Sequence, residues 1–171
     1  MPMNHIFIRK ISGFSLLEVL ISLLIIMAGA LGIAGIQLQA INNTEVARYQ
    51  SLAALLASSM AAEMQANVAY WDTAPAIAPT ITVSGTTITG GPTSGSCLNT
   101  VCNSSQMAYY TLQNWGGALA ATLPSGTGTV TCMTTTPAVC RLKLSWNDNY
   151  TAISASTLPN TQTYTTLVTV Q

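Results

Sequence analysis

The sequence predicts an α+β fold, in which one long N-terminal helix packs against a small antiparallel β-sheet in the C-terminal part of the chain. Two observations carry this prediction. A continuous apolar run extends from Phe14 to Ile36, with Glu18 as its only charged residue. Beyond residue 80, threonine, serine and glycine dominate and apolar residues alternate with polar ones, which is typical of half-buried strands.

The composition excludes several classes of function. The 171 residues include five Lys or Arg, five Asp or Glu and one His, so 6% of the chain is charged and 49% is apolar. Disordered tails and ordinary cytosolic proteins carry far more charge. Five scattered basic residues cannot neutralise a run of phosphates, so we expect no nucleic-acid partner. With His5 as the single imidazole, we expect no enzyme activity, no catalytic residue, no metal and no cofactor.

The apolar run at residues 14–36 is long enough to cross a membrane. As a helix it would extend about 34 Å, which spans the hydrocarbon core of a bilayer. Its Leu, Ile, Val and Phe residues together outweigh the cost of about 3 kcal/mol for inserting Glu18. Arg9 and Lys10 precede the run and no basic residue follows until Arg48, so the N-terminus is expected in the cytoplasm and the rest on the other side.

Three interpretations of residues 1–36 compete. A cleaved secretory signal would end at the small residues at positions 28–30, but a carboxylate in its apolar core is unexpected. A plain membrane anchor also leaves Glu18 as an unexplained cost. In the third interpretation the chain is cut after Gly13, and Glu18 is required once the basic leader is gone. The third interpretation explains the most residues.

The residues around this junction resemble a known family. The stretch Gly13-Phe14-Ser15-Leu16-Leu17-Glu18-Val19-Leu20 resembles the class III signal of type IV pilins and pseudopilins: a basic leader ending in Gly, then Phe, then Glu four residues later and an apolar helix. Residues 9–72 are similar more narrowly to the PilV-type minor pilins. The resemblance implies the type IV pilin fold. We expect a leader peptide (1–13), a transmembrane and filament-core helix (14–36), its amphipathic continuation (37–72) and an exported, disulfide-containing, β-rich domain (73–171).

The resemblance assigns roles to three residues. A prepilin peptidase would cut between Gly13 and Phe14 and methylate the new amine of Phe14. Glycine before the cut lets a protease approach the backbone closely, because it has no Cβ. In an apolar filament core, Glu18 would neutralise the Phe14 amine of its own or a neighbouring subunit. Desolvation cancels much of the Coulomb gain, so this pairing sets the register of subunits more than their stability.

Gly29, Gly32 and Gly35 interrupt the apolar helix at three-residue intervals, and each costs about 1 kcal/mol of helix stability relative to Ala. One interpretation, implied by the pilins that the chain resembles, is flexibility: this segment unwinds in the filament. The other is a stripe of small residues that lets a second helix approach closely in the membrane. The sequence favours neither.

Apolar residues beyond the membrane run recur at three- and four-residue spacings, which predicts a helix with one apolar face that continues to about Asn67. These residues are Val46, Tyr49, Ala53, Leu56, Met60 and Met64. Pro75 and Pro79 mark the end of the helix. We expect strands at residues 81–83, 129–133, 141–146 and 164–170, and a short helix at 107–122 despite Gly116 and Gly117. So small a sheet must pack on the Met60 face of the long helix.

Four cysteines, Cys97, Cys102, Cys132 and Cys140, lie in the expected exported domain. An even number in an oxidising compartment predicts two disulfides, for which three connectivities exist. We favour Cys97–Cys102, which closes a local loop, and Cys132–Cys140, which bridges a hairpin. A four-thiolate zinc site is disfavoured because the chain has no Cys-x-x-Cys.

The function implied by the resemblance is structural. It is that of a minor pilin in a type IV pilus, which inserts in the bacterial inner membrane with its C-terminal domain in the periplasm and then enters the cell-surface filament at or near the tip. There it would prime assembly and support adhesion and twitching motility. The implied partners are the prepilin peptidase, other minor and major pilins and a large tip adhesin. The alternative is a minor pseudopilin of a type II secretion system. A membrane-anchored periplasmic enzyme and a DNA-uptake receptor are disfavoured.

Overall fold

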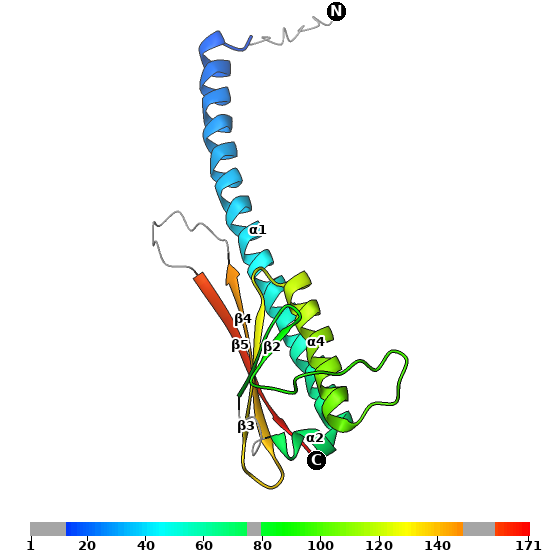
Figure 1. The fold of residues 1–171 in the computed structure, drawn as a ribbon. Helices are drawn as coiled ribbons and strands as arrows, with labels where there is room; N and C mark the ends of the chain where they lie inside the picture. Colours follow the sequence, from blue (N-terminus) through cyan, green and yellow to red (C-terminus); the bar gives the residue numbers. More distant parts are fainter. Residues whose placement is uncertain (1–12, 75–79, 149–159) are drawn as a thin grey trace, which may run out of the picture. The chain divides into compact units, whose positions relative to one another are not determined.

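The computed structural model describes residues 13–74, 80–148 and 160–171 (Figure 1). Over these residues the fold is α+β, as expected from the sequence. In chain order the elements are α1 (Leu16–Ala66), α2 (Val68–Trp71), β1 (Thr80–Ser84), β2 (Thr87–Thr89), α4 (Ser104–Thr122), β3 (Thr127–Met133), β4 (Val139–Asp148) and β5 (Asn160–Thr169). The chain divides into two compact units, residues 1–43 and 44–171, and each has its own organisation.

The first unit contains the N-terminal part of α1. Residues Leu16–Gln37 form 22 residues of helix with a mean hydropathy of 2.6, and none of this segment is buried. By length and composition the helix can cross a membrane. A helix that is apolar around its whole circumference is stable only where lipid or other protein covers it, so this segment requires surroundings that the single chain does not supply.

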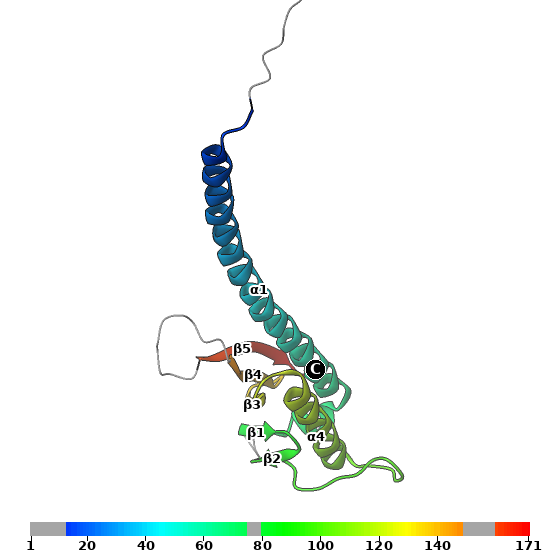
Figure 2. The same cartoon turned by 90° about the horizontal axis from the view of Figure 1, so that it is seen from above.

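The second unit has two layers. Its sheet has five antiparallel strands in the order β2-β1-β3-β4-β5. The C-terminal part of α1 and helix α4 lie together over one face of this sheet, and Figure 2 shows both helices on the same side. The chain passes from β1 and β2 through α4 to β3, so α4 connects the two halves of the sheet.

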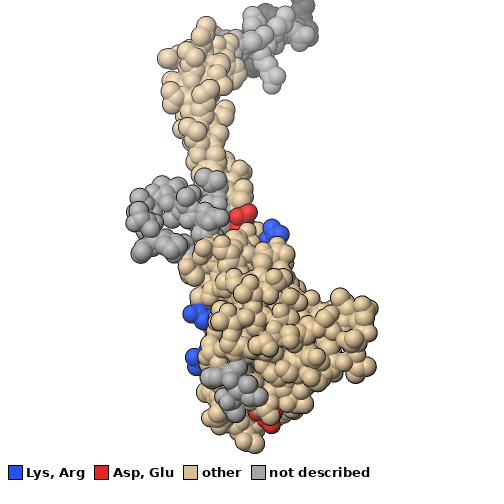
Figure 3. Space-filling model, viewed as in Figure 1, with Lys and Arg blue, Asp and Glu red and all other residues tan. Residues whose placement is uncertain are grey.

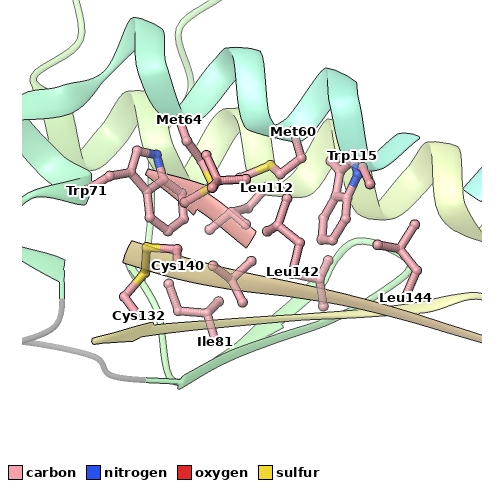
Figure 4. Close-up of a cluster of buried hydrophobic side chains, with 14 of the residues drawn as sticks. Met60, Met64, Trp71, Ile81, Leu112, Trp115, Cys132, Cys140, Leu142 and Leu144 are labelled. Atoms are coloured by element: carbon pink, nitrogen blue, oxygen red, sulfur yellow. A yellow bond between two sulfur atoms is a disulfide. The ribbon is translucent and has the colours of Figure 1, made fainter. Parts of the chain in front are cut away.

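The core lies between these two layers. The predicted apolar face of α1 is confirmed, because Ala53, Met60 and Met64 are fully buried and the more N-terminal Tyr49 is half-buried. Figure 4 shows the two methionines pointing from α1 into the cluster formed with α4 and the sheet. On β4, residues 142, 144 and 146 are buried whereas Arg141 and Lys143 are exposed, which is the expected alternation.

Helix α4 begins three residues before the predicted start at Met107, and its N-terminus explains why. Asn103 forms a capping box with Gln106: the Gln106 N–H donates to Asn103 Oδ1 at 2.8 Å, and the Asn103 N–H donates to Gln106 Oε1 at 3.1 Å. Two further hydrogen bonds join α4 to the C-terminal part of α1 and to Asn67, the residue that follows it. Asn67 Nδ2 donates to the Ser104 carbonyl at 2.7 Å, and Trp115 Nε1 donates to the Leu56 carbonyl at 2.9 Å.

The glycine pair inside α4 does not interrupt the helix. Gly116 is buried where α4 crosses the hairpin of β1 and β2, and a Cβ there would collide with the Gly85 carbonyl oxygen and with Val83 Cγ1. The same atom added to Gly117 would meet nothing within 4 Å. Gly116 is therefore required for close contact between a helix and a turn, which a pattern based on helix propensity cannot detect.

The expected strands all form, and each is longer than predicted; the last also begins four residues earlier and ends one residue earlier than predicted. Strand β2 was not expected. It has three residues and is joined to β1 by a two-residue turn in which Gly85 has a φ of 54°. The helix α1 ends at Ala66, close to the predicted end, whereas Pro75 and Pro79 lie outside the described residues.

Both disulfides join the pairs that the sequence favours. Cys132 and Cys140 lie directly opposite each other on β3 and β4, and their disulfide is buried in the core (Figure 4). Cys97 and Cys102 close a loop before α4 in which Leu98 is 73% exposed. On the chain-entropy account, each closed loop stabilises the fold by about 2 to 3 kcal/mol.

Candidate processing and assembly site

The expected cut site lies in exposed backbone just before α1. Gly13, Phe14 and Ser15 precede the first helical residue, Leu16, and all are exposed. Phe14 is 83% exposed, and a Cβ added to Gly13 would meet no atom within 4 Å. Non-helical, exposed backbone is what a protease needs in order to bind a substrate segment. The backbone from Gly13 onward is therefore accessible to an enzyme that cuts the Gly13–Phe14 bond.

Glu18 lies in the first turn of α1 and is exposed. Its N–H donates to the Ser15 carbonyl at 3.0 Å, and its own carbonyl accepts from Ser22 Oγ at 2.7 Å. A carboxylate in the first turn is stabilised by the positive end of the helix dipole. Glu18 is four positions after Phe14, so if the helix extends to a new N-terminus at Phe14, the amine would lie about one helical turn from the carboxylate.

The surroundings of Glu18 determine what the carboxylate can do. No other charged residue occurs between residues 16 and 44, and the neighbouring side chains are Leu, Val and Ile. A lone carboxylate moved into lipid or into a bundle of apolar helices is costly unless a cation accompanies it. The amine created by cutting before Phe14 is the nearest cation that the sequence can provide.

The three glycines of the apolar run all lie within α1, which is helical throughout. A Cβ added to Gly29, Gly32 or Gly35 would meet nothing within 4 Å. The packing of the single chain therefore does not explain why these positions are glycine. Unwinding in a filament and close approach of a second helix both remain as interpretations.

A groove of about 280 Å³, open to solvent, lies within the second unit between α1 and α4. Its lining consists of Leu56, Ser59, Met60, Glu63, Met107, Tyr110, Thr111, Asn114, Trp115 and Ala118. Glu63 and Tyr110 are its only titratable groups, and this pair contains neither a nucleophile with its base nor a set of metal ligands. Elsewhere in the described parts of the chain, no group of three His, Cys, Asp or Glu residues could hold a metal ion.

Comparison with known families gives a match to the N-terminal part of the chain. Residues 8–34 match the family described as the prokaryotic N-terminal methylation motif. The matched range contains Gly13, Phe14, Glu18 and two of the three glycines of the apolar run, Gly29 and Gly32. It ends within the first unit, so the sheet and α4 lie outside the match. No curated protein and no solved structure matches the chain.

Proposed function

We propose that this chain is a minor pilin of a type IV pilus, because it carries the N-terminal signal of type IV pilin- and pseudopilin-type substrates of prepilin peptidase. The signal and the apolar helix segment Leu16–Gln37 fit anchoring in the inner membrane and incorporation in a pilus. The second unit then forms the folded head of the subunit.

One observation carries this proposal. The matched motif runs into a 22-residue helix segment, Leu16–Gln37, with a mean hydropathy of 2.6, none of which is buried in the chain's own fold. Exposed side chains such as Leu16, at 80%, and Leu31, at 76%, need cover from lipid and later from other helices. A subunit that passes from a bilayer into a filament core of packed helices is covered first by lipid and then by other helices.

We infer three events, in order, from the matched signal. Prepilin peptidase cuts between Gly13 and Phe14 and removes Arg9 and Lys10 with the leader, which leaves three basic and five acidic side chains in the mature chain. The amine of Phe14 is methylated. In the filament, the carboxylate of Glu18 pairs with this amine on its own or a neighbouring subunit and fixes the axial position of the helices.

The narrower assignment rests on the resemblance of residues 9–72 to PilV-type minor pilins. It implies a position at or near the tip of the pilus, contacts with other minor and major pilins and with a large tip adhesin, and a role in priming assembly. Adhesion and twitching motility are the outputs that such a position would support.

The processing step is tested by the intact mass of the protein from native membranes or sheared filaments. We expect a chain that begins at Phe14, about 14 Da heavier from one methyl group and about 4 Da lighter than its reduced form from two disulfides. A chain that begins at Leu31 would identify an ordinary secreted protein. An uncut N-terminus would identify a simple anchor, and either result would contradict the proposal.

The assembly step is tested by comparing Glu18→Ala with Glu45→Ala. Both residues are exposed acids on α1, but Glu45 lies beyond the apolar run. We expect Glu18→Ala to be cut normally and to enter filaments at least tenfold less than wild type, while Glu45→Ala enters at the wild-type level. Equal incorporation of Glu18→Ala would exclude the pairing.

The same signal serves pseudopilins of type II secretion systems, so the two assemblies need a direct test. We expect the chain in fibres sheared from the cell surface, and we expect its deletion to reduce the number of these fibres. If the chain is absent from surface fibres and its deletion instead blocks release of an exported protein, it is a pseudopilin.

A further inference from the structure

The sheet of the second unit has one short edge and one long edge. The strand β2 at one edge has three residues, whereas β5 at the other has ten. β5 pairs with β4 from Asn160 to Thr169 without a bulge. No described residue of the chain pairs with the other side of β5, so this side presents an open row of backbone groups (Figures 1 and 2).

The register fixes which groups face this open side. Val170 N donates to the Ala138 carbonyl at 2.9 Å, continuing the pairing of Thr169 with Val139. Even-numbered residues of β5 therefore exchange hydrogen bonds with β4, and odd-numbered residues direct both N–H and C=O away from it. The odd-numbered residues are Thr161, Thr163, Thr165, Leu167 and Thr169, and all five are exposed.

The β5 edge lacks the features that usually protect an edge strand. Natural edges are blocked by lysine or another charge, by proline, by a bulge or by very short length. The sequence Asn160–Thr169 has no charged residue, no proline and no glycine, and is rich in threonine and other residues that favour strands. An edge of this kind is suited to bind an extended polypeptide as an additional strand.

The charges near this edge indicate what kind of polypeptide fits. Arg141 and Lys143 are exposed on the outward face of β4, opposite Leu167 and Thr165 of β5. Among the described strand residues on that face there is no carboxylate, and Figure 3 shows how few charged groups the visible surface has. A strand added beside β5 would lie about 10 Å from β4, which an arginine or lysine side chain and an acidic side chain can bridge.

We propose that β5 is a docking edge for an extended acidic segment of another protein, which adds to the sheet as a sixth strand. Its backbone pairs with the odd-numbered residues of β5, and its outward carboxylates lie toward Arg141 and Lys143. The edge lies in the second unit and uses no residue of the N-terminal signal. A failure of this proposal is therefore distinguishable from a failure of the proposed assembly in a filament.

The first test measures binding of synthetic peptides to the full mature chain in detergent micelles, by fluorescence anisotropy. The probe is a ten-residue peptide of alternating threonine and glutamate. The matched controls are the same peptide with lysine in place of glutamate, and the acidic peptide with alternate backbone nitrogens methylated. We expect the acidic peptide to bind at least tenfold more tightly than the lysine peptide, and the methylated peptide not to bind.

Each contrary result overturns a stated part of the proposal. Equal binding of the acidic and lysine peptides excludes the role of Arg141 and Lys143. Equal binding of the methylated peptide excludes strand addition, because methylation removes the hydrogen-bond donors. No binding of the acidic peptide at millimolar concentration excludes the docking edge.

Variants of the chain locate the site. Thr165→Pro removes an outward N–H that β4 does not use, and is expected to weaken binding of the acidic peptide at least tenfold. Arg141→Glu combined with Lys143→Glu is expected to do the same, whereas Arg48→Glu, an exposed cation outside the sheet, should leave binding unchanged. Unchanged binding by the double variant overturns the proposal even if Thr165→Pro fails to fold.

A second copy of this chain is the other occupant that the edge could accept. Two β5 strands paired antiparallel about Thr165 would place the two Thr165 residues opposite each other, so Thr165→Cys would form a disulfide-linked dimer. We expect this variant to remain monomeric under oxidising conditions. Efficient cross-linking, together with failure to bind the acidic peptide, would replace the proposed partner with a second subunit.

Discussion

Two buried tryptophans differ in how their indole N–H groups are satisfied. Trp115 is 5% exposed, and its Nε1 donates to the Leu56 carbonyl of α1 at 2.9 Å. Trp71 is fully buried and packs edge-on against Tyr70, with ring centroids 5.1 Å apart, but its Nε1 has no partner among the described residues. Trp115 joins α4 to α1 by a hydrogen bond. Trp71 contributes packing only, and its buried N–H without a hydrogen bond reduces the stability of the fold.

This difference predicts unequal effects of the same substitution. Trp115→Phe and Trp71→Phe remove the same atoms from the core, but only Trp115→Phe breaks a hydrogen bond. We expect Trp115→Phe to reduce the free energy of unfolding by about 1 to 3 kcal/mol more than Trp71→Phe does, measured by urea denaturation. If the two variants lose equal stability, the bond from Trp115 to Leu56 contributes nothing.

Tyr70 predicts how stability changes in alkaline solution. Burial raises the pKa of the Tyr70 hydroxyl above its ordinary value of 10.0. The unfolded chain then loses this proton at a lower pH than the folded chain, so the contribution is fully present below about pH 10 and is lost as the pH rises through the folded pKa. We expect Tyr70→Phe to show a smaller decline in melting temperature above pH 10 than wild type. An identical decline would show that Tyr70 does not cause it.

At the scale of elements, the position of α4 over the sheet depends on a missing side chain. Gly116 lets the helix approach the turn at Gly85, and Gly128 on β3 likewise lies directly beneath the ring of Trp115. A Cβ on Gly128 would collide with that ring. Both contacts lie between layers, so glycine here determines how closely the helix and the sheet can pack.

The adjacent glycines of α4 provide a matched pair of variants. Gly116→Ala is expected to reduce the free energy of unfolding by about 1 to 3 kcal/mol, because the new Cβ collides with Gly85 and Val83. Gly117→Ala has open space around it and is expected to stabilise the fold by about 0.5 to 1 kcal/mol, since alanine is the better helix former. Equal effects, by thermal or urea unfolding, would contradict the close approach of α4.

The elements that the sequence predicted are those with a strong local pattern. Alternation on β4 and the three- and four-residue spacing on α1 each reflect one buried face, so both could be identified without a structure. β2 could not, because three residues carry no clear period and its pairing depends on the turn at Gly85. Gly116 and Gly117 suggested a weak helix for a similar reason: the contact that Gly116 permits, with the turn at Gly85, involves residues far away in the sequence.

At the scale of the whole molecule, the buried core and the exposed apolar helix lie in different units. The first buried core residue in the sequence is Ala53, and the core continues from there to Val170. In the first unit, by contrast, the described segment Leu16–Gln37 is an exposed apolar helix. The fold of the second unit therefore draws its stability from residues that all lie within 44–171.

This separation predicts that a fragment of residues 44–171 folds without the apolar helix. We expect it to be soluble without detergent, to form both disulfides and to show the same melting temperature as the full chain in micelles, within a few degrees, because no core residue has been removed. Circular dichroism and non-reducing peptide mapping would measure this. An unfolded fragment would mean that residues before Thr44 contribute to the core.

The processing and assembly site could be found from the sequence, whereas the open edge of β5 could not. The reason is the distance along the chain between the residues that form each of them. The cut site and Glu18 lie within six consecutive residues, so one short pattern contains them all. The open edge of β5 could not be found in this way. Its exposure depends on the strand order of the sheet, and the relation of Arg141 to Leu167 depends on the register between β4 and β5.

The strand order also has a consequence for the time at which the sheet forms. β5 follows β4 in the chain, so a sheet that assembles before β5 is synthesised has β4 as its edge. That temporary edge carries Arg141 and Lys143, which are the kind of charges that discourage pairing with a foreign strand. The unprotected edge comes into being only when β5 joins the sheet, so it is absent while β1 to β4 pair.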